Sequence, residues 1–197
     1  MITLEGISKS FEEDVLKDFH YKFSSGSIFK IIGKNGSGKT TLLKIIKGIY
    51  MPCSGKISFS SPLQGYDDIS YIDNNMRSFI FRLKVIDNLK YFSSLNKIGR
   101  FDYIYNLFDQ LNCSNLLNKN FSELSSGQMQ LISIIRGLSH KPKVILLDEV
   151  FATLDESNRN KVLDFVSKYV SQSNGCLIFT SHQTDNLEYK TIDLEKC

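Results

Sequence analysis

Hydrophobic residues form nearly continuous apolar runs in three places along the chain. The runs cover residues 28–32, 144–147 and 176–180, and each has the length of a single strand. Continuous runs, rather than alternating ones, are typical of parallel strands that are buried on both faces. The chain is therefore expected to contain a mainly parallel sheet with helices on both of its faces.

Between these runs, apolar residues recur at the spacing of one face of an α-helix. Pro52 and Gly55 follow the first such stripe and Pro142 follows the second, so these residues are expected to end the helical regions. The stripes consist of Leu42, Ile45, Ile46 and Ile49, of Leu131, Ile134, Ile135 and Leu138, and of Val162, Phe165, Val166 and Tyr169.

Shorter patterns complete the predicted architecture. Segments at residues 2–4, 21–23, 56–60 and 69–72 are typical of further strands. The first two lie before the helical stripes and predict an N-terminal antiparallel β part.

From about residue 76 to residue 140 the strand-like runs give way to helical segments, such as residues 86–92 and 103–108. This change predicts a helical subdomain inserted into the α/β body. The whole chain, residues 1–197, is expected to form one domain of the α/β class.

A glycine-rich loop, Gly-Lys-Asn-Gly-Ser-Gly-Lys-Thr-Thr at residues 33–41, follows the first apolar run. It fits the phosphate-binding pattern G-x-x-x-x-G-K-[ST]. Glycine is needed because the backbone curls tightly and directs successive N–H groups toward phosphate oxygens. Lys39 is predicted to reach the β- and γ-phosphates of a nucleoside triphosphate, and Thr40 to bind its Mg²⁺. The positive end of the following helix favours the same anion.

Two carboxylates, Asp148 and Glu149, close the apolar run at residues 144–147. The carboxyl end of a parallel strand is where open α/β sheets place their ligands. Asp148 is predicted to hold Mg²⁺ through water, and Glu149 to orient or deprotonate the water that attacks the γ-phosphate. Taken alone, the pair could instead cap the next turn, but the phosphate loop favours the catalytic interpretation.

The composition is that of an ordinary folded domain, with 42% hydrophobic and 23% charged residues among 197. The net charge of +3 is small and its basic residues are spread along the chain, so no nucleic-acid partner is expected. The four cysteines lack the spacing of a metal site or a disulfide framework, which indicates incidental thiols in a reducing cytosol.

The N-terminus lacks the basic and apolar regions of a signal peptide. No apolar run approaches the roughly 18 residues that a membrane-spanning helix needs. The protein is therefore expected in the cytoplasm, and any membrane function is expected to come from a partner.

The sequence resembles the ATP-binding subunit of an ABC transporter over nearly its whole length. The resemblance rests on the loop at residues 33–41, on Leu-Ser-Ser-Gly-Gln at residues 124–128, and on the strand that ends in Asp148 and Glu149, in that order. The middle segment is the discriminating one, because many other phosphate-loop ATPases share only the first and the last. The resemblance implies a P-loop NTPase core, the cofactors ATP and Mg²⁺, a second copy or a similar subunit as dimer partner, and an integral-membrane permease at the inner face of the cell membrane.

The resemblance also implies roles for single residues. Ser125 and Gly127 would meet the γ-phosphate held by the other protomer, His182 would contact the γ-phosphate, and Phe11 would stack on adenine. From the residues alone, other roles stay open: Ser125 could cap a helix, His182 could be structural, and Phe11 could pack in the core. The implied catalytic residues are Glu149, His182 and Lys39, and the implied metal ligands are Thr40, Asp148 and Asn74. The implied nucleotide-binding residues are Phe11, Gly33, Lys34, Asn35, Gly36, Ser37, Gly38, Lys39, Thr40, Thr41, Ser125, Gly127, Gln128 and Asp155.

Three positions depart from the family pattern. Ser126 replaces a glycine, and Val150 stands where a proline commonly follows the catalytic glutamate, which changes the stiffness of the turn. Asn74 aligns with the glutamine that links nucleotide sensing to the membrane partner, and its side chain is one methylene shorter. Coupling to the partner is therefore the function most affected by these departures.

Residues 76–83 interleave arginines with aromatic residues and are a candidate docking surface for a membrane protein, with packing inside the lobe as the alternative. The run at residues 77–79, together with residues 82–83 and 88–89, also resembles exporter-type subunits. A soluble ABC-type ATPase that is not coupled to transport is a second hypothesis, although no sustained heptads or second ATPase domain are present. A binding-only subunit is a third, and the presence of Lys39, Asp148 and Glu149 argues against it.

Overall fold

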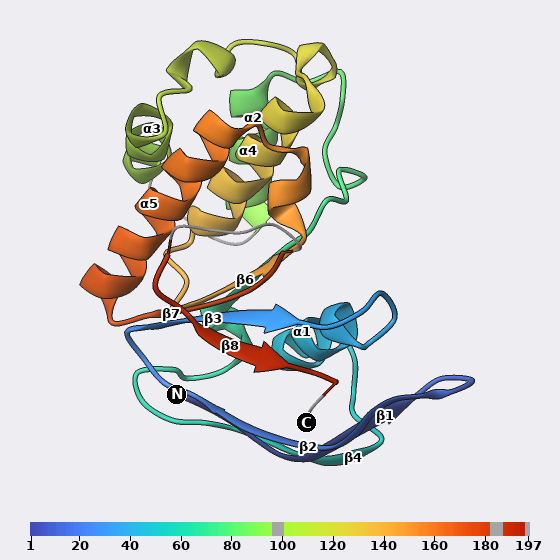
Figure 1. Cartoon of the computed structure of the whole chain (residues 1–197). Helices are drawn as coiled ribbons and strands as arrows, with labels where there is room; N and C mark the ends of the chain where they lie inside the picture. The colour runs from blue at the N-terminus through green and yellow to red at the C-terminus, as the bar shows by residue number, and fades with distance from the viewer. Residues whose placement is uncertain (96–100, 182–186, 196–197) are drawn as a thin grey trace.

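The computed structural model describes residues 1–95, 101–181 and 187–195, and this part of the chain is an α/β structure with two sheets (Figure 1). The smaller sheet is antiparallel and consists, in spatial order, of β2 (Asp14–Phe23), β1 (Ile2–Ser10) and β4 (Ser54–Phe59). The larger sheet is parallel and consists, in spatial order, of β5 (Ile69–Ile72), β6 (Val144–Asp148), β7 (Cys176–Thr180), β3 (Ser27–Ile32) and β8 (Lys190–Asp193). The predicted mainly parallel sheet and N-terminal antiparallel part are thus confirmed.

The helices cover both faces of the parallel sheet, as Figure 1 shows. One helix, α1 (Lys39–Lys47), lies between the parallel sheet and the antiparallel sheet. The other face is covered by α2 (Val85–Leu95), α3 (Phe101–Gln110), α4 (Ser126–Leu138) and α5 (Glu156–Ser173). The helical segments predicted between residues 76 and 140 are therefore present, and the boundaries of that subdomain stay a prediction.

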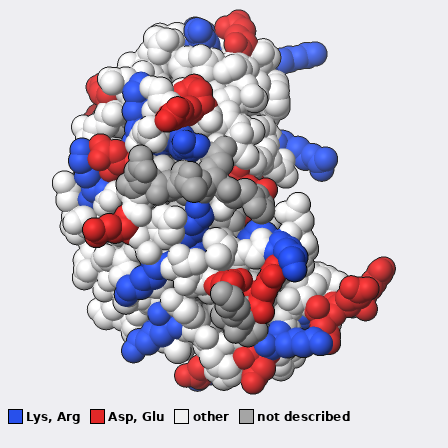
Figure 2. Space-filling view, viewed as in Figure 1, with Lys and Arg blue, Asp and Glu red and all other residues white. Residues whose placement is uncertain are grey.

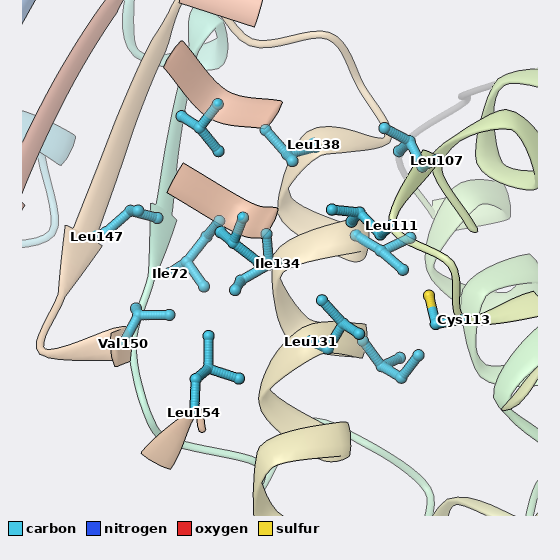
Figure 3. Close-up of a cluster of buried hydrophobic side chains, with 14 of the residues drawn as sticks. Ile72, Leu107, Leu111, Cys113, Leu131, Ile134, Leu138, Leu147, Val150 and Leu154 are labelled. Carbon is cyan, nitrogen blue, oxygen red and sulfur yellow. The ribbon is translucent and has the colours of Figure 1, made fainter. Parts of the chain in front are cut away.

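Strand β6 shows why a continuous apolar run predicts a central parallel strand. Ile145 and Leu147 belong to the hydrophobic cluster under α4 and α5, whereas Val144 and Leu146 belong to the cluster around α1. Figure 3 shows the first cluster, in which Leu147 lies among side chains from β5 and α4. Because both faces are buried, every position of the strand is apolar until Asp148 ends it.

Two sequence expectations were wrong in detail. The first helix ends at Lys47, where Gly48 adopts a left-handed conformation with φ 79°, so Ile49 lies outside the stripe and is 52% exposed. Gly55 does not end a helical region but lies inside β4. Glycine is needed at this position because a side chain would overlap the backbone of Gly6 on β1.

No described helix is long and apolar enough to cross a membrane. On the face shown in Figure 2, basic and acidic side chains are interspersed. This distribution agrees with the small net charge of +3.

Candidate functional site

The phosphate loop joins the end of β3 to the start of α1 at the carboxyl edge of the parallel sheet. Gly38 has φ 92°, and a Cβ there would lie 2.9 Å from Cγ1 of Val15 on β2. Gly36 has φ 84° and faces open space. Glycine is therefore needed at position 38 both for its conformation and for the close approach of β2.

A cavity of about 490 Å³ lies over this loop. Phe11 forms part of its wall and is 58% exposed, with its ring edge-on to Tyr50 at 5.7 Å between centroids. Phe11 is thus placed beside the loop and outside the core. Val15 is a lining residue that the sequence did not reveal. The wall is formed by Phe11, Val15, Asn35, Gly36, Gly38, Lys39, Thr40, Thr41 and Glu149.

The two lysines of the loop have different surroundings. The ammonium of Lys39 donates to the carbonyl oxygens of Gly33 and Lys34, both at 2.8 Å, and so lies folded within the loop. Lys34 faces the C-terminal segment: its backbone N–H donates to Glu195 at 2.8 Å and its ammonium lies 3.3 Å from the same carboxylate. Of these two, only Lys39 lines the cavity among the residues that the structure describes.

A second, smaller cavity of about 320 Å³ adjoins the loop at the carboxyl ends of β5 and β6; we call it the metal pocket. The hydroxyl of Thr40 donates to Oδ1 of Asp148 at 3.1 Å, which joins the loop to the end of β6. The lining residues are Thr40, Lys44, Tyr71, Asp73, Asn74, Asn75, Asp148 and Glu149.

The carboxylate of Asp148 is held by two further hydroxyl groups. Thr180 on β7 donates to Oδ1 at 3.0 Å, and Tyr71 on β5 donates to Oδ2 at 2.8 Å. The hydroxyl of Thr180 also accepts the backbone N–H of Glu149 at 2.9 Å. Burial and the neighbouring Asp148 carboxylate raise the pKa of Tyr71 above its usual value, so its hydroxyl keeps its proton. The sequence did not indicate Tyr71 or Thr180, because their roles depend on which residues lie opposite Asp148 in the sheet.

Glu149 begins the turn after β6 in a left-handed conformation, with φ 53° and ψ 23°. The amide of Asn74 donates to its carbonyl oxygen at 3.0 Å. Glu149 lines both cavities, so it lies between the loop and the metal pocket. The structure therefore brings together Lys39, Thr40, Asn74, Asp148 and Glu149, and their roles stay a prediction.

The donor chemistry of the metal pocket fits Mg²⁺. Thr40, Asn74, Asp148 and Glu149 offer oxygen ligands. No cluster of three or more His, Cys, Asp and Glu residues suited to a metal occurs in residues 1–95, 101–181 and 187–195. Such a set suits Mg²⁺, because this ion keeps several waters and takes its other ligands from one or two side chains and from phosphates.

The segment at residues 124–128 lies elsewhere in the molecule. Figure 1 shows the start of α4 in the helical lobe, away from the loop that precedes α1. Ser125 caps α4: its hydroxyl accepts the N–H of Gln128 at 3.3 Å, and the Gln128 side chain accepts the N–H of Ser125 at 3.1 Å. Gly127 packs closely under the turn after β6, because a Cβ there would lie 3.0 Å from the carbonyl oxygen of Thr153.

Asp155 caps α5 in the same region. Its carboxylate accepts the N–H and the side-chain amide of Asn158, both at 2.8 Å, and the backbone bond is the main reason that its pKa is lowered. Asp155 and the segment at residues 124–128 thus lie near one another but outside both cavities. His182, the remaining predicted site residue, lies outside the described residues.

A third cavity, about 640 Å³, opens between β5 and the helical lobe; we call it the docking groove. Arg136 forms one wall, with its guanidinium 4.2 Å from the ring centre of Phe79 and 4.6 Å from that of Phe92. Phe79 is 4% exposed and stacks on Phe121, so it packs inside the lobe rather than on a surface. The groove is lined by Lys47, Asp67, Ile69, Ser70, Tyr71, Ser78, Phe92, Arg136, Gly137, Ser139 and His140.

Comparison with known proteins matches residues 16–152 to the ABC transporter family. The molybdate/tungstate import ATP-binding protein WtpC of Thermococcus kodakarensis is 31% identical over 194 residues, which cover 92% of this chain and 57% of that protein. The ergothioneine transport ATP-binding protein EgtV of Helicobacter pylori is 30% identical over 208 residues, covering 99% of this chain and 97% of EgtV. A solved metal-chelate type ABC transporter in an inward-facing conformation superposes with a TM-score of 0.82 at 29% identity, over 98% of this chain and 79% of that one. The chain thus spans little more than half the length of WtpC.

Proposed function

The chain belongs to the ABC transporter family, and we propose that it is the ATP-binding subunit that hydrolyses ATP in a dimer and drives transport through a separate membrane permease. The observation that carries the proposal is the 3.1 Å contact between Thr40 and Asp148, which joins the phosphate loop to the carboxylate pair. One continuous site then offers groups for phosphates, metal and water.

Each residue of this site has a proposed role. Lys39 leaves its loop carbonyls and binds the β- and γ-phosphates. Thr40 and Asn74 would offer oxygen to Mg²⁺, and Asp148 would hold the ion through water. When bound, such an ion would supply positive charge that offsets the phosphate charge. Glu149 orients or deprotonates the attacking water.

The distance of the segment at residues 124–128 from the loop supports dimerisation. Its helix N-terminus and the Ser125 hydroxyl suit a phosphate, yet they lie outside the cavities that hold Lys39 and Glu149. We propose that a second protomer brings its own Ser125, Gly127 and Gln128 to this γ-phosphate, with Asp155 at the same interface. ATP is then held between two subunits.

The docking groove is the proposed site for the permease. Its wall combines the half-buried Arg136 with Phe92 and small residues such as Ser70 and Gly137. Exposed Arg77 and Arg82 lie at the start of the same lobe. A subunit docked in this way is placed at the inner face of the cell membrane. The likeness of residues 77–79, 82–83 and 88–89 to exporter-type subunits makes export the proposed direction, whereas WtpC is named for import.

Replacement of the proposed catalytic base tests the site. In Glu149→Gln, ATP hydrolysis is expected to fall to background while the ATP-dependent dimer, followed by light scattering, persists longer. Glu5→Gln, which removes an exposed carboxylate on β1, is the control. Normal turnover in Glu149→Gln would remove this residue from the mechanism.

Copurification from membranes tests the partner. A tagged chain is expected to recover a multi-span membrane protein, and Asp67→Lys, which reverses an exposed charge in the docking groove, is expected to lose it. Recovery of ribosomal or other soluble material alone would instead favour an ABC-type ATPase that is not coupled to transport. Uptake assays in right-side-out and inside-out vesicles then assign the direction.

A further inference from the structure

Tyr71 is the residue at which the metal pocket and the docking groove meet. It lies on the edge strand β5, next to β6, which ends in Asp148, and it lines both cavities. Its neighbour Ser70 lines the docking groove but not the metal pocket, whereas Asn74 lines the metal pocket but not the groove. A displacement of Tyr71 would therefore change the lining of both cavities.

On the side of the metal pocket, Tyr71 makes one directed contact. Its hydroxyl donates to Oδ2 of Asp148 at 2.8 Å, whereas Thr40 and Thr180 both donate to Oδ1. Tyr71 is thus the described residue that fixes the second oxygen of this carboxylate. Donors that orient a carboxylate near a metal determine how well it binds that metal.

On the side of the groove, β5 packs tightly against α4. A Cβ on Gly137 of α4 would overlap the side chain of Ile72 and lie 2.9 Å from Oγ of Ser70. Figure 3 shows Ile72 beside Ile134 of the same helix. Any shift of α4 caused by a group in the groove is therefore transmitted to β5 rather than absorbed in free space.

Asn74 has a different contact. Its amide is bound to the carbonyl of Glu149, so it reaches the turn after β6 but not the Asp148 carboxylate. We infer that Tyr71 is a positioning residue that fixes the Asp148 carboxylate for Mg²⁺ and passes movement of the docking groove to the metal site. The part of this inference that concerns the groove rests on the proposed permease site.

Tyr71→Phe tests the inference because it removes only the hydroxyl. Tyr169→Phe is the matched control: Tyr169 is also half-buried and also donates one hydrogen bond, to the carbonyl of Pro142 at 2.9 Å, far from the metal pocket. The readouts are the affinity of the ADP-bound protein for Mn²⁺ by electron paramagnetic resonance, the affinity for ADP in EDTA, and the thermal midpoint. The full chain is used throughout.

Tyr71→Phe is expected to weaken Mn²⁺ binding about tenfold, with ADP affinity in EDTA unchanged and a thermal midpoint equal to that of Tyr169→Phe. Unchanged or tighter Mn²⁺ binding overturns the inference. So does an equal loss in Tyr169→Phe, because the effect would then be a general loosening of the fold. Failure of the chain to copurify with a permease would overturn the proposed function and leave the Mn²⁺ result standing.

Gly137→Ala tests the transmission from the groove. The added methyl presses on Ile72 and Ser70 of β5, so Mn²⁺ affinity is expected to change in the native background and to change less when combined with Tyr71→Phe. Equal effects of Gly137→Ala in the two backgrounds would contradict a route through the Tyr71 hydroxyl.

Discussion

The side-chain amide of Asn74 donates to the backbone carbonyl of Glu149 at 3.0 Å. Asn74 follows β5 and Glu149 follows β6, so the contact ties together the two turns at the carboxyl edge of neighbouring strands. A residue aligned with the family's metal-contacting glutamine thus also holds the turn of the proposed base.

Asn74→Ala is therefore expected to slow hydrolysis without weakening nucleotide binding. Loss of one hydrogen bond of about 1 kcal/mol at the turn of Glu149 corresponds to roughly a fivefold lower turnover. Steady-state ATPase rates and ADP affinity in EDTA are the measurements. Asn75→Ala is the control, because the Asn75 side chain binds the N–H of Arg77 and not Glu149. A rate equal to that of the control would exclude this role.

Val150→Pro is expected to be harmful although a proline is common at this position in the family. A proline disfavours helical conformations of the residue before it, and Glu149 adopts φ 53° and ψ 23° here. Forcing Glu149 into an extended conformation would break its bonds with Asn74 and Thr180. The expected cost is about 1–3 kcal/mol of unfolding free energy, together with lower ATPase activity. Val150→Ala, measured in the same urea titration, is the control and reports the loss of side-chain packing alone. A proline variant as stable as this alanine variant would contradict the prediction.

The sequence predicted those strands and helices whose own pattern of apolar residues indicates their type. The runs that became β3, β6 and β7 are almost wholly apolar because both faces are buried, although β3 contains Lys30 and β7 ends in Thr180. Strand β8 was not predicted, because Ile192 is its only fully buried residue and its other three positions are polar or charged. The equally short edge strand β5 has three buried positions and two isoleucines, and it was predicted.

The candidate site was predictable wherever a motif is local. Residues 33–41 and the pair Asp148–Glu149 each lie together in the sequence, and the structure places them together in space. Tyr71 and Thr180 reach Asp148 from neighbouring strands, so only the register of the sheet reveals them. The left-handed turn at Glu149 likewise depends on its contacts and not on residue type.

Arg136→Ala is expected to destabilise the helical lobe. The guanidinium lies over Phe79 and Phe92 and donates to Oγ of Ser78 at 2.6 Å. Burial lowers the pKa of Arg136, and cation–π contacts in such desolvated positions contribute about 2 kcal/mol. Urea unfolding is expected to show a loss of this size, with partial recovery in Arg136→Lys. Arg82→Ala, at an exposed position, is the control. If both alanine variants lost the same small amount of unfolding free energy, the contacts of Arg136 with Phe79 and Phe92 would not stabilise the lobe.

His140 is expected to make stability depend on pH. Burial, helped by the positive charge of Lys47, lowers the pKa of His140 below its usual value. As pH falls below about 6.5, the unfolded chain takes up a proton that the folded chain resists, so stability present at neutral pH is lost. The thermal midpoint of the native protein should therefore fall more steeply between pH 7 and pH 5, roughly the range over which histidine titrates, than that of His140→Gln. Parallel slopes in the native protein and in His140→Gln would contradict the assignment.

The three cysteines within the described residues are expected to differ sharply in reactivity. Cys53 is exposed, and hydrogen bonding to Ser10 lowers the pKa of its thiol. Burial raises the pKa of both Cys113 and Cys176 to about 12. Because the thiolate is the reactive form, iodoacetamide at mildly alkaline pH should modify Cys53 in the folded protein and reach the two buried thiols only after unfolding. Peptide mapping by mass spectrometry measures the extent at each position, and Cys53→Ser is the control. Modification of Cys113 or Cys176 at the rate of Cys53 in the folded protein would show that the two hydrophobic clusters open far more readily than their packing indicates.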